Sequence, residues 1–181
     1  MARSTFAGPV RSLSGAYTQG PGSVVTITSS TTLNPIDHAG RILLVGGTLA
    51  ANVVLTLPQI VTTPNPASSG PGEDPSTANN LGVTYTIMVP TTIATSSLKI
   101  ATAIATDLYV GCVLSVDTDT SNALAYFTPN GTSNDFINFN GGTTGGVIGT
   151  WVEITAIAAS KYRVNGIAFG TGVVATPFAD A

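Results

Sequence analysis

Between residues 23 and 167, short runs of apolar and β-branched residues are separated by glycine, proline and asparagine. In residues 83–89 apolar and polar positions alternate, so that Val83, Tyr85, Ile87 and Val89 share one face. Such alternation indicates a strand with one buried face. The runs predict ten short strands, at residues 23–29, 41–45, 52–57, 83–89, 98–102, 108–116, 124–128, 136–139, 151–157 and 161–167.

Helical periodicity is missing from the pattern. No stretch keeps an apolar period of 3.6 residues over three turns, and residues 101–105 are long enough for one helical turn only. We therefore expect less than about 10% helix. Many short strands joined by glycine and proline turns are typical of all-β folds, and the prediction is a β-sandwich or a jelly-roll-like barrel. The absence of a repeat of fixed period disfavours a β-helix or solenoid.

Three regions are predicted from the distribution of turn residues. Residues 1–22, which end in Gly-Pro-Gly, form an extended N-terminal arm, and residues 23–167 form the β-sandwich body. Within the body, residues 61–82 hold four prolines, three glycines and three asparagines, which is typical of a long surface loop. Residues 168–181 form a glycine-rich C-terminal tail.

The segments 151–157 and 161–167 predict a hairpin across residues 158–160. On its first strand Val152 and Ile154 share one face, whereas Trp151 and Glu153 share the other. We expect the first pair to lie in the core. Apolar residues of both strands are expected in the core or in a subunit interface: Trp151, Val152, Ile154, Tyr162 and Val164.

Composition narrows the function classes. Only 8% of the 181 residues are charged, the net charge is −3, and 43% are hydrophobic. This composition excludes an intrinsically disordered chain. It also excludes a helical bundle, which would be rich in Leu, Glu and Lys. Six cations are too few to form the basic stripe of a nucleic-acid-binding protein. A single cysteine excludes an intramolecular disulfide. Prolines interrupt the uncharged span after Arg41, and residues 1–22 lack the apolar run of a secretory signal, so neither a membrane helix nor a targeting segment is expected.

Few residues are candidates for chemistry. His38 follows Asp37, but adjacent residues rarely form the His–Asp pair of a hydrolase, and a turn or interface histidine is favoured. Asp117, Asp119 and Asn122 have the spacing of the opening of a calcium loop, which lacks the glycine and glutamate that would complete it, and a solvated turn is favoured.

The remaining candidates also favour structural roles. Cys112 is expected to be a small buried hydrophobe, and residues 130–132 (Asn-Gly-Thr) to be a tight turn. No pair of the nine acidic residues is singled out by spacing, as a glycosidase would need. We therefore predict no enzyme, with no catalytic, cofactor-binding or metal-binding residue.

The surface gives the strongest hint of function. Fifteen charges are too few to cover a folded chain of this length, and depletion of charge is characteristic of interface cores. Either neutral Thr, Ser, Asn and Gly residues cover the outside, or much of the surface is buried in an assembly. The second interpretation fits a subunit of a larger structure.

The order of segments resembles a group of known proteins. An arm with Ala-Gly-Pro-Val at 7–10 leads into Thr-rich strands. A Gly-Gly turn precedes the strand from Trp151 to Ile154, and the strand Lys-Tyr-Arg-Val-Asn-Gly follows at 161–166. A glycine-rich tail with Pro177-Phe178 ends the order. This order resembles small virion structural proteins of tailed bacteriophages, in particular capsid decoration (cement) and head-fibre proteins. The resemblance implies a homotrimer, each subunit a β-sandwich or jelly roll, bound to the major capsid protein on the capsid exterior, with no cofactor.

Two alternatives remain open. The first is capsid decoration, and the second is a tail-fibre or receptor-binding domain that contacts the host surface. In either case the arm is the predicted partner-binding segment, through the apolar side chains and cations Arg3, Phe6, Val10, Arg11, Leu13 and Tyr17. The competing interpretation is that residues 1–22 hold the first strand of the body.

Overall fold

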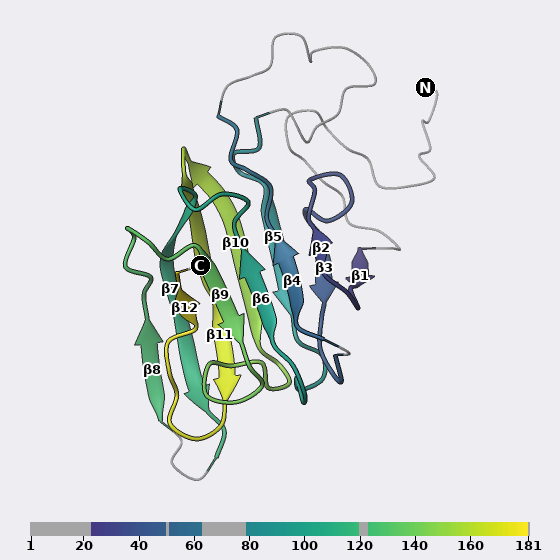
Figure 1. The fold of residues 1–181 in the computed structure, drawn as a ribbon, viewed down its shortest axis with the longest axis vertical. Coiled ribbons are helices and arrows are strands. Elements are labelled where there is room, and N and C mark those ends of the chain that lie inside the picture. The colour runs from purple at the N-terminus through teal and green to yellow at the C-terminus, as the bar shows by residue number, and fades with distance from the viewer. Residues whose placement is uncertain (1–22, 50, 63–78, 120–122, 181) are drawn as a thin grey trace, which may run out of the picture.

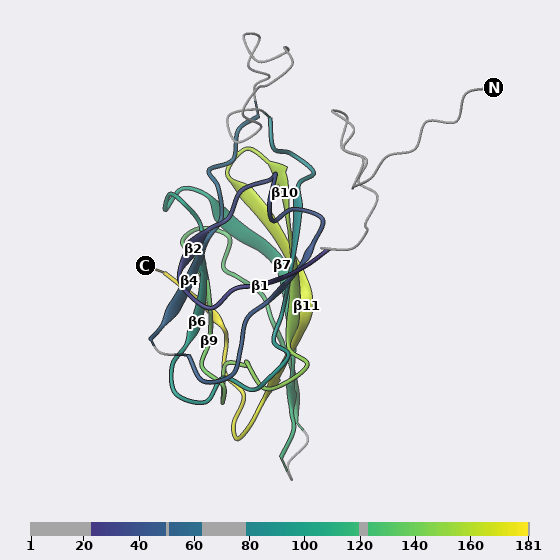
Figure 2. The same cartoon turned by 90° about the vertical axis from the view of Figure 1, so that its right-hand side faces the viewer.

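A computed structural model describes residues 23–49, 51–62, 79–119 and 123–180 (Figure 1). Within these ranges the chain contains twelve β-strands and no helix. The strands form two sheets that pack face to face, seen edge-on in Figure 2. The prediction of an all-β sandwich is confirmed, and residues 101–105 are not helical.

The larger sheet has seven strands. In spatial order they are β1 (Val24–Thr26), β3 (Ile42–Leu44), β5 (Thr84–Met88), β10 (Trp151–Ala158), β11 (Lys161–Gly170), β7 (Leu108–Asp117) and β8 (Leu124–Phe127). The smaller sheet has five strands, in the order β12 (Phe178–Ala179), β9 (Phe136–Phe139), β6 (Leu98–Ala101), β4 (Val53–Thr56) and β2 (Thr31–Thr32).

Each of the ten predicted segments contains a strand, whereas β2 and β12 were not predicted. Both are two residues long, too short for a pattern of alternation. The predicted end of the body at residue 167 lies inside β11, which continues to Gly170. Beyond it, Phe178 is buried and its ring lies 6.4 Å from that of Tyr109, so part of the predicted tail belongs to the sandwich.

The first six strands alternate between the two sheets. The first four each pair in parallel with the strand two positions later: β1 with β3, β2 with β4, β3 with β5 and β4 with β6. The chain thus makes three turns of a short solenoid, a winding that the sequence pattern disfavoured. The turns have unequal lengths, because the paired residues Val24 and Ile42 are 18 positions apart and Ile42 and Thr86 are 44 apart. The sequence therefore shows no repeat of fixed period.

The second half of the large sheet is mostly antiparallel. β10 pairs with β5 on one side and β11 on the other, and the β10–β11 hairpin turns at Ser160, which has a φ of 56°. The predicted hairpin is confirmed. β11 then pairs in parallel with β7, and β7 is antiparallel to β8.

The core lies between the sheets. Val152, Ile154, Tyr162 and Val164 are buried there, as predicted, whereas Trp151 lies half-buried on the opposite face of β10. The largest fully buried side chains come from both sheets and their connecting loops: Tyr85, Tyr109, Tyr162, Phe139, Leu33, Leu43, Leu55, Leu57, Ile87, Leu98, Ile100 and Ile137.

A glycine-rich loop between β9 and β10 packs against one end of the sandwich. Gly141 has a φ of +74° and faces the backbone carbonyl of Ile93 so closely that a Cβ atom would overlap it. At the end of the loop the buried Thr150 hydroxyl accepts hydrogen bonds from the amides of Gly146 and Phe169, at 3.1 Å and 3.0 Å. Glycine is required at position 141 because any side chain there would meet the backbone of Ile93.

Candidate docking surface

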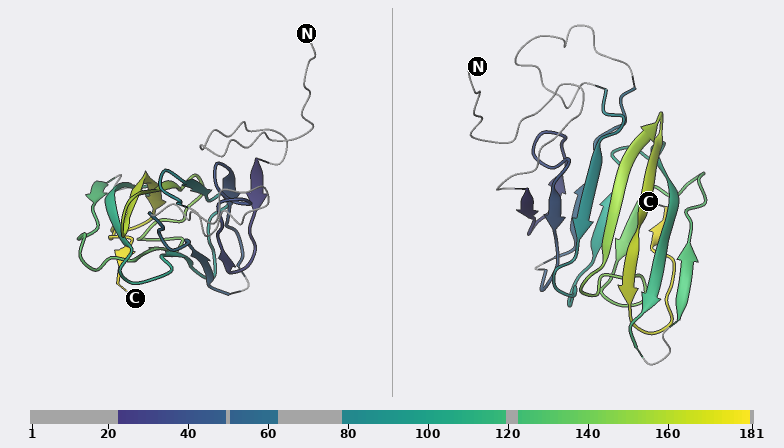
Figure 3. Two further views of the ribbon diagram at one scale, coloured as in Figure 1. Left: turned by 90° about the horizontal axis from the view of Figure 1, so that it is seen from above. Right: turned by 180° about the vertical axis from the view of Figure 1, so that it is seen from behind.

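The outer face of the seven-stranded sheet carries a row of apolar side chains. The strand register aligns one residue from each of six neighbouring strands, in the order Leu44, Met88, Trp151, Ile167, Leu114 and Tyr126. Their neighbours along each strand point into the sandwich, so these six point outward. Met88 is 37% exposed and Tyr126 74%, and the other four are half-buried. The right-hand view of Figure 3 shows this sheet face on.

The row has further apolar neighbours on the same face. Phe169, Val116 and Leu124 are aligned on β11, β7 and β8, and Leu124 is 67% exposed. On the other side of the row, β1 and β3 contribute Val24 and Ile42. The outer row and these neighbours together are called the apolar face below.

Charge is sparse on this side of the sheet. Among the outward positions of its strands, only Glu153, Lys161 and Arg163 are charged. Lys161 lies at the end of β11, and its ammonium donates a 2.9 Å hydrogen bond to the carbonyl of Gly131. One carboxylate and one guanidinium therefore remain on the face, on the neighbouring strands β10 and β11.

Cys112 lies on this face as well. It was predicted to be a buried small hydrophobe, but it is half-buried on the outward side of β7, beside Asn165. The prediction was incomplete because a continuous apolar run does not show which side of the strand faces the core.

The outer face of the smaller sheet differs in character. It carries Lys99 and Asn138 on adjacent strands, and the Lys99 ammonium lies 3.6 Å from the centroid of the Phe136 ring. Lys99 is the only charged residue at the outward strand positions that the structure describes in this sheet, and the cation–π contact stabilises its charge. The apolar face of the larger sheet is therefore the stronger candidate for docking.

The residues predicted to bind a partner lie outside the described ranges. They are Arg3, Phe6, Val10, Arg11, Leu13 and Tyr17, and the docking-arm hypothesis stays a prediction. The sequence did carry a signal for the apolar face. In residues 108–116 one alternating set of positions is wholly apolar and the other contains Tyr109 and Val113, a pattern typical of strands covered on both sides.

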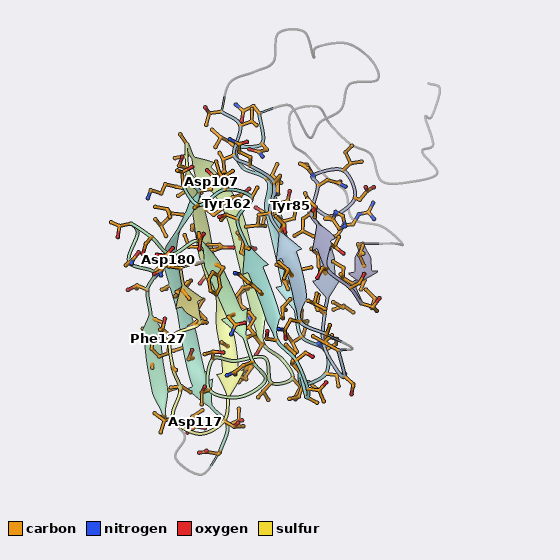
Figure 4. All side chains as sticks on the ribbon, in the orientation of Figure 1. Tyr85, Asp107, Asp117, Phe127, Tyr162 and Asp180 are labelled. Atoms are coloured by element: carbon orange, nitrogen blue, oxygen red, sulfur yellow. The ribbon has the colours of Figure 1, made fainter. Side chains whose placement is uncertain are left out.

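Buried polar groups meet at the opposite end of the sandwich from Asp117 (Figure 4). The Tyr162 hydroxyl donates a 2.6 Å hydrogen bond to the carbonyl of Pro58, and the Asp107 carboxylate accepts one of 2.9 Å from the amide of Ile60. Burial raises the pKa of Asp107, although hydrogen bonds from the Ile60 amide and the Ser160 hydroxyl act to lower it. Burial also raises the pKa of Tyr162. These contacts anchor the segment that precedes residue 61.

Substitutions at Asp107 test this anchor. The Asp107→Ala variant leaves the buried Ile60 amide without its acceptor, which should lower the free energy of unfolding by about 1–3 kcal/mol. Asp107→Asn retains an acceptor oxygen and should be at least as stable as the native chain at pH 7. Urea unfolding of both variants measures the difference.

The pH dependence follows from the direction of the shift. Because the folded-state pKa of Asp107 lies above the ordinary value of 3.8, the folded protein holds this proton at pH values where the unfolded chain has lost it. The native chain should therefore gain stability relative to Asp107→Asn as the pH falls from 7 towards 4. A difference that stays constant, or changes in the opposite direction, would contradict the raised pKa.

His38 lies in a turn, as predicted. Its Nδ1 accepts a 3.0 Å hydrogen bond from the amide of Asn34, and the neighbouring Asp37 carboxylate accepts one of 2.9 Å from the Asn34 side chain. Both side chains therefore stabilise the turn that connects β2 to β3.

The acidic turn after β7 is held by hydrogen bonds from backbone amides, one within the turn and one from the C-terminal segment. Asp117 accepts from the amide of Asp119, and Asp119 accepts from the amide of Gly172, at 3.0 Å and 2.8 Å. Asn122 lies outside the described residues. Within those residues, no three or more His, Cys, Asp and Glu side chains are grouped so that they could hold a metal ion.

Asn130 forms the predicted tight turn. Its side-chain oxygen accepts hydrogen bonds from the amides of Thr132, Ser133 and Asn134, at 2.9–3.2 Å. The turn leads the chain from β8 in one sheet to β9 in the other.

Comparison with known proteins finds no matching family model, no matching curated protein and no matching solved structure. In the part of the chain that the structure describes, no helix is long and apolar enough to span a membrane.

Proposed function

We propose that this protein is a virion structural protein that decorates and stabilises a bacteriophage capsid. It binds the shell of major capsid protein from the outside, as a homotrimer. The observation that carries the proposal is the charge-poor apolar face on the outer side of the sandwich, because monomeric soluble proteins rarely expose large contiguous apolar patches. The order of arm, Thr-rich strands and glycine-rich tail in the sequence supports the phage setting.

The buried polar groups support a structural role over an enzymatic one. Asp107, Tyr109 and Tyr162 form hydrogen bonds to backbone groups of the sandwich, and His38 is used within its own turn. Asp107, Tyr162 and His38 hold connecting segments in place, and Tyr109 links β7 to β6 of the other sheet. The protein is proposed to act through its surfaces.

The position of β1 supports a docking role for residues 1–22. β1 is the edge strand of the seven-stranded sheet, and Val24 on it is 50% exposed. A segment that precedes β1 therefore starts beside an open sheet edge. In this proposal the arm binds a neighbouring subunit or the capsid, by strand addition and by its apolar side chains.

Deletion of residues 2–20 tests the role of the arm. We expect the shortened chain to melt within a few degrees of the native chain and to lose binding to capsids that lack this protein. Co-sedimentation with such capsids measures the occupancy. Full occupancy by the shortened chain would contradict the arm hypothesis, and loss of folding would show that the segment belongs to the body.

The second candidate function is a tail-fibre or receptor-binding domain. The exposed ring of Tyr126 favours it, since aromatic side chains with one polar end are common in binding surfaces. The copy number per particle separates the two functions: decoration requires hundreds of copies over the capsid, whereas a fibre requires a few to tens at one position. Electron microscopy of the particle measures this number and the position of the protein.

A further inference from the structure

The apolar row on the large sheet is arranged symmetrically about one line. Three of its residues, Leu44, Met88 and Trp151, lie on β3, β5 and β10. The other three lie on β11, β7 and β8, and they are Ile167, Leu114 and Tyr126. The line between β10 and β11 therefore divides the row into equal halves.

We propose that two copies of the chain pair through this face. The two-fold axis lies in the plane of contact, parallel to the strands and above the line between β10 and β11. This rotation stacks β10 on β11 of the second copy, β5 on β7 and β3 on β8. Trp151 then faces Ile167, Met88 faces Leu114, and Leu44 faces Tyr126, so each apolar residue of the row meets an apolar residue.

The same rotation brings the two charged residues of the face, Glu153 and Arg163, together. Glu153 pairs with Asn165 across the β10–β11 ladder, and Arg163 pairs with Thr155 in the neighbouring row. The axis lies between these strands, so the rotation brings Glu153 of one copy next to Arg163 of the second copy. Every contact of a two-fold interface occurs twice, and both carboxylates and both guanidinium groups therefore find a partner.

The size of the face fits a stable contact. Six neighbouring strands at a spacing of about 4.8 Å span roughly 24 Å. A standard protein interface covers about 800 Å² on each partner, which corresponds to a patch of similar width. Two twisted sheets pack face to face in this way inside β-sandwiches, with their side chains interdigitating.

The contact goes beyond the proposed function and does not depend on it: the second copy covers the apolar face, so a chain that also binds the capsid does so through its arm and its remaining surfaces. A three-fold axis of a trimer cannot coincide with this two-fold contact, so the two would use different surfaces. A chain that forms both would assemble as a dimer of trimers, and a chain that forms the two-fold contact alone would be a dimer.

Charge reversal tests the contact on the full-length protein. In a Glu153→Arg variant two arginines of different copies meet, and in an Arg163→Glu variant two glutamates meet, so each should associate at least about tenfold more weakly than the native chain. Mass measurement in solution should give an even multiple of the 18.2 kDa chain for the native protein and half that mass for either variant. An equal mixture of the two variants should regain the native mass, because each mixed contact again joins opposite charges.

Two further variants serve as controls. Lys99→Glu reverses a charge on the outer face of the smaller sheet and should leave the mass unchanged. Met88→Lys adds a charge to the apolar row at an exposed position, and mixing with either charge variant should not rescue its weak association. Circular dichroism and thermal melting verify that each variant is folded.

Three results would overturn the proposal. The first is a native mass of one or three chains. The second is a native mass that neither charge reversal changes. The third is a mixture of the two reversed variants that stays at half mass. If the proposal fails in any of these ways, capsid binding by the native chain still tests the proposed decoration function separately.

Discussion

The Gly141→Ala variant is expected to lose about 2–5 kcal/mol of its free energy of unfolding. Gly141 adopts a φ of +74°, where an L-residue with a Cβ costs roughly 1–2 kcal/mol. The added methyl group also overlaps the backbone carbonyl of Ile93, and relief of such an overlap costs a further 1–3 kcal/mol, approximately. Urea unfolding followed by tryptophan fluorescence measures the loss.

Gly172→Ala is the matched control. Its φ is +73°, but no atom lies within 4 Å of the position that a Cβ would occupy. This variant should carry the conformational cost alone, about 1–2 kcal/mol. Equal losses of unfolding free energy at both positions would show that the overlap with Ile93 costs nothing, because this end of the sandwich can rearrange to make room for the methyl group.

The Ile154→Ala variant should lose about 2–5 kcal/mol, because the side chain is 0% exposed in the middle of the core and its removal leaves a cavity. Thermal melting and urea unfolding measure the effect. The same change at Ile36, which is 44% exposed in the turn before β3, should cost less than about 1 kcal/mol. A small loss at Ile154 would mean that the two sheets can move together to fill the space.

The strands could be predicted from the sequence because their signal is local. Alternation in residues 83–89 follows directly from the two-residue period of an extended chain, and Tyr85 and Ile87 point inward as the pattern indicates. The β10–β11 hairpin is also local, since only two residues connect Ala158 to its partner Lys161. β2 and β12 left no such signal because two residues cannot alternate.

The winding of the first half could not be predicted in the same way. Parallel pairs such as Ile42 and Thr86 join residues that are far apart in sequence, and the long connection between β4 and β5 changes the length of one turn only. Loop closure costs little more for a long connection than for a short one, so the fold tolerates the insertion while the repeat disappears from the sequence.

The sequence by itself determined the all-β class, the position of most strands and the low charge of the surface. These follow from side-chain shape and polarity at each position. Only the tertiary structure decided that Leu44, Met88, Trp151, Ile167, Leu114 and Tyr126 form one row, because a row across a sheet depends on strand order and register. The local pattern of a single strand contains neither the strand order nor the register. Both depend on which strands pair when the core between the two sheets forms.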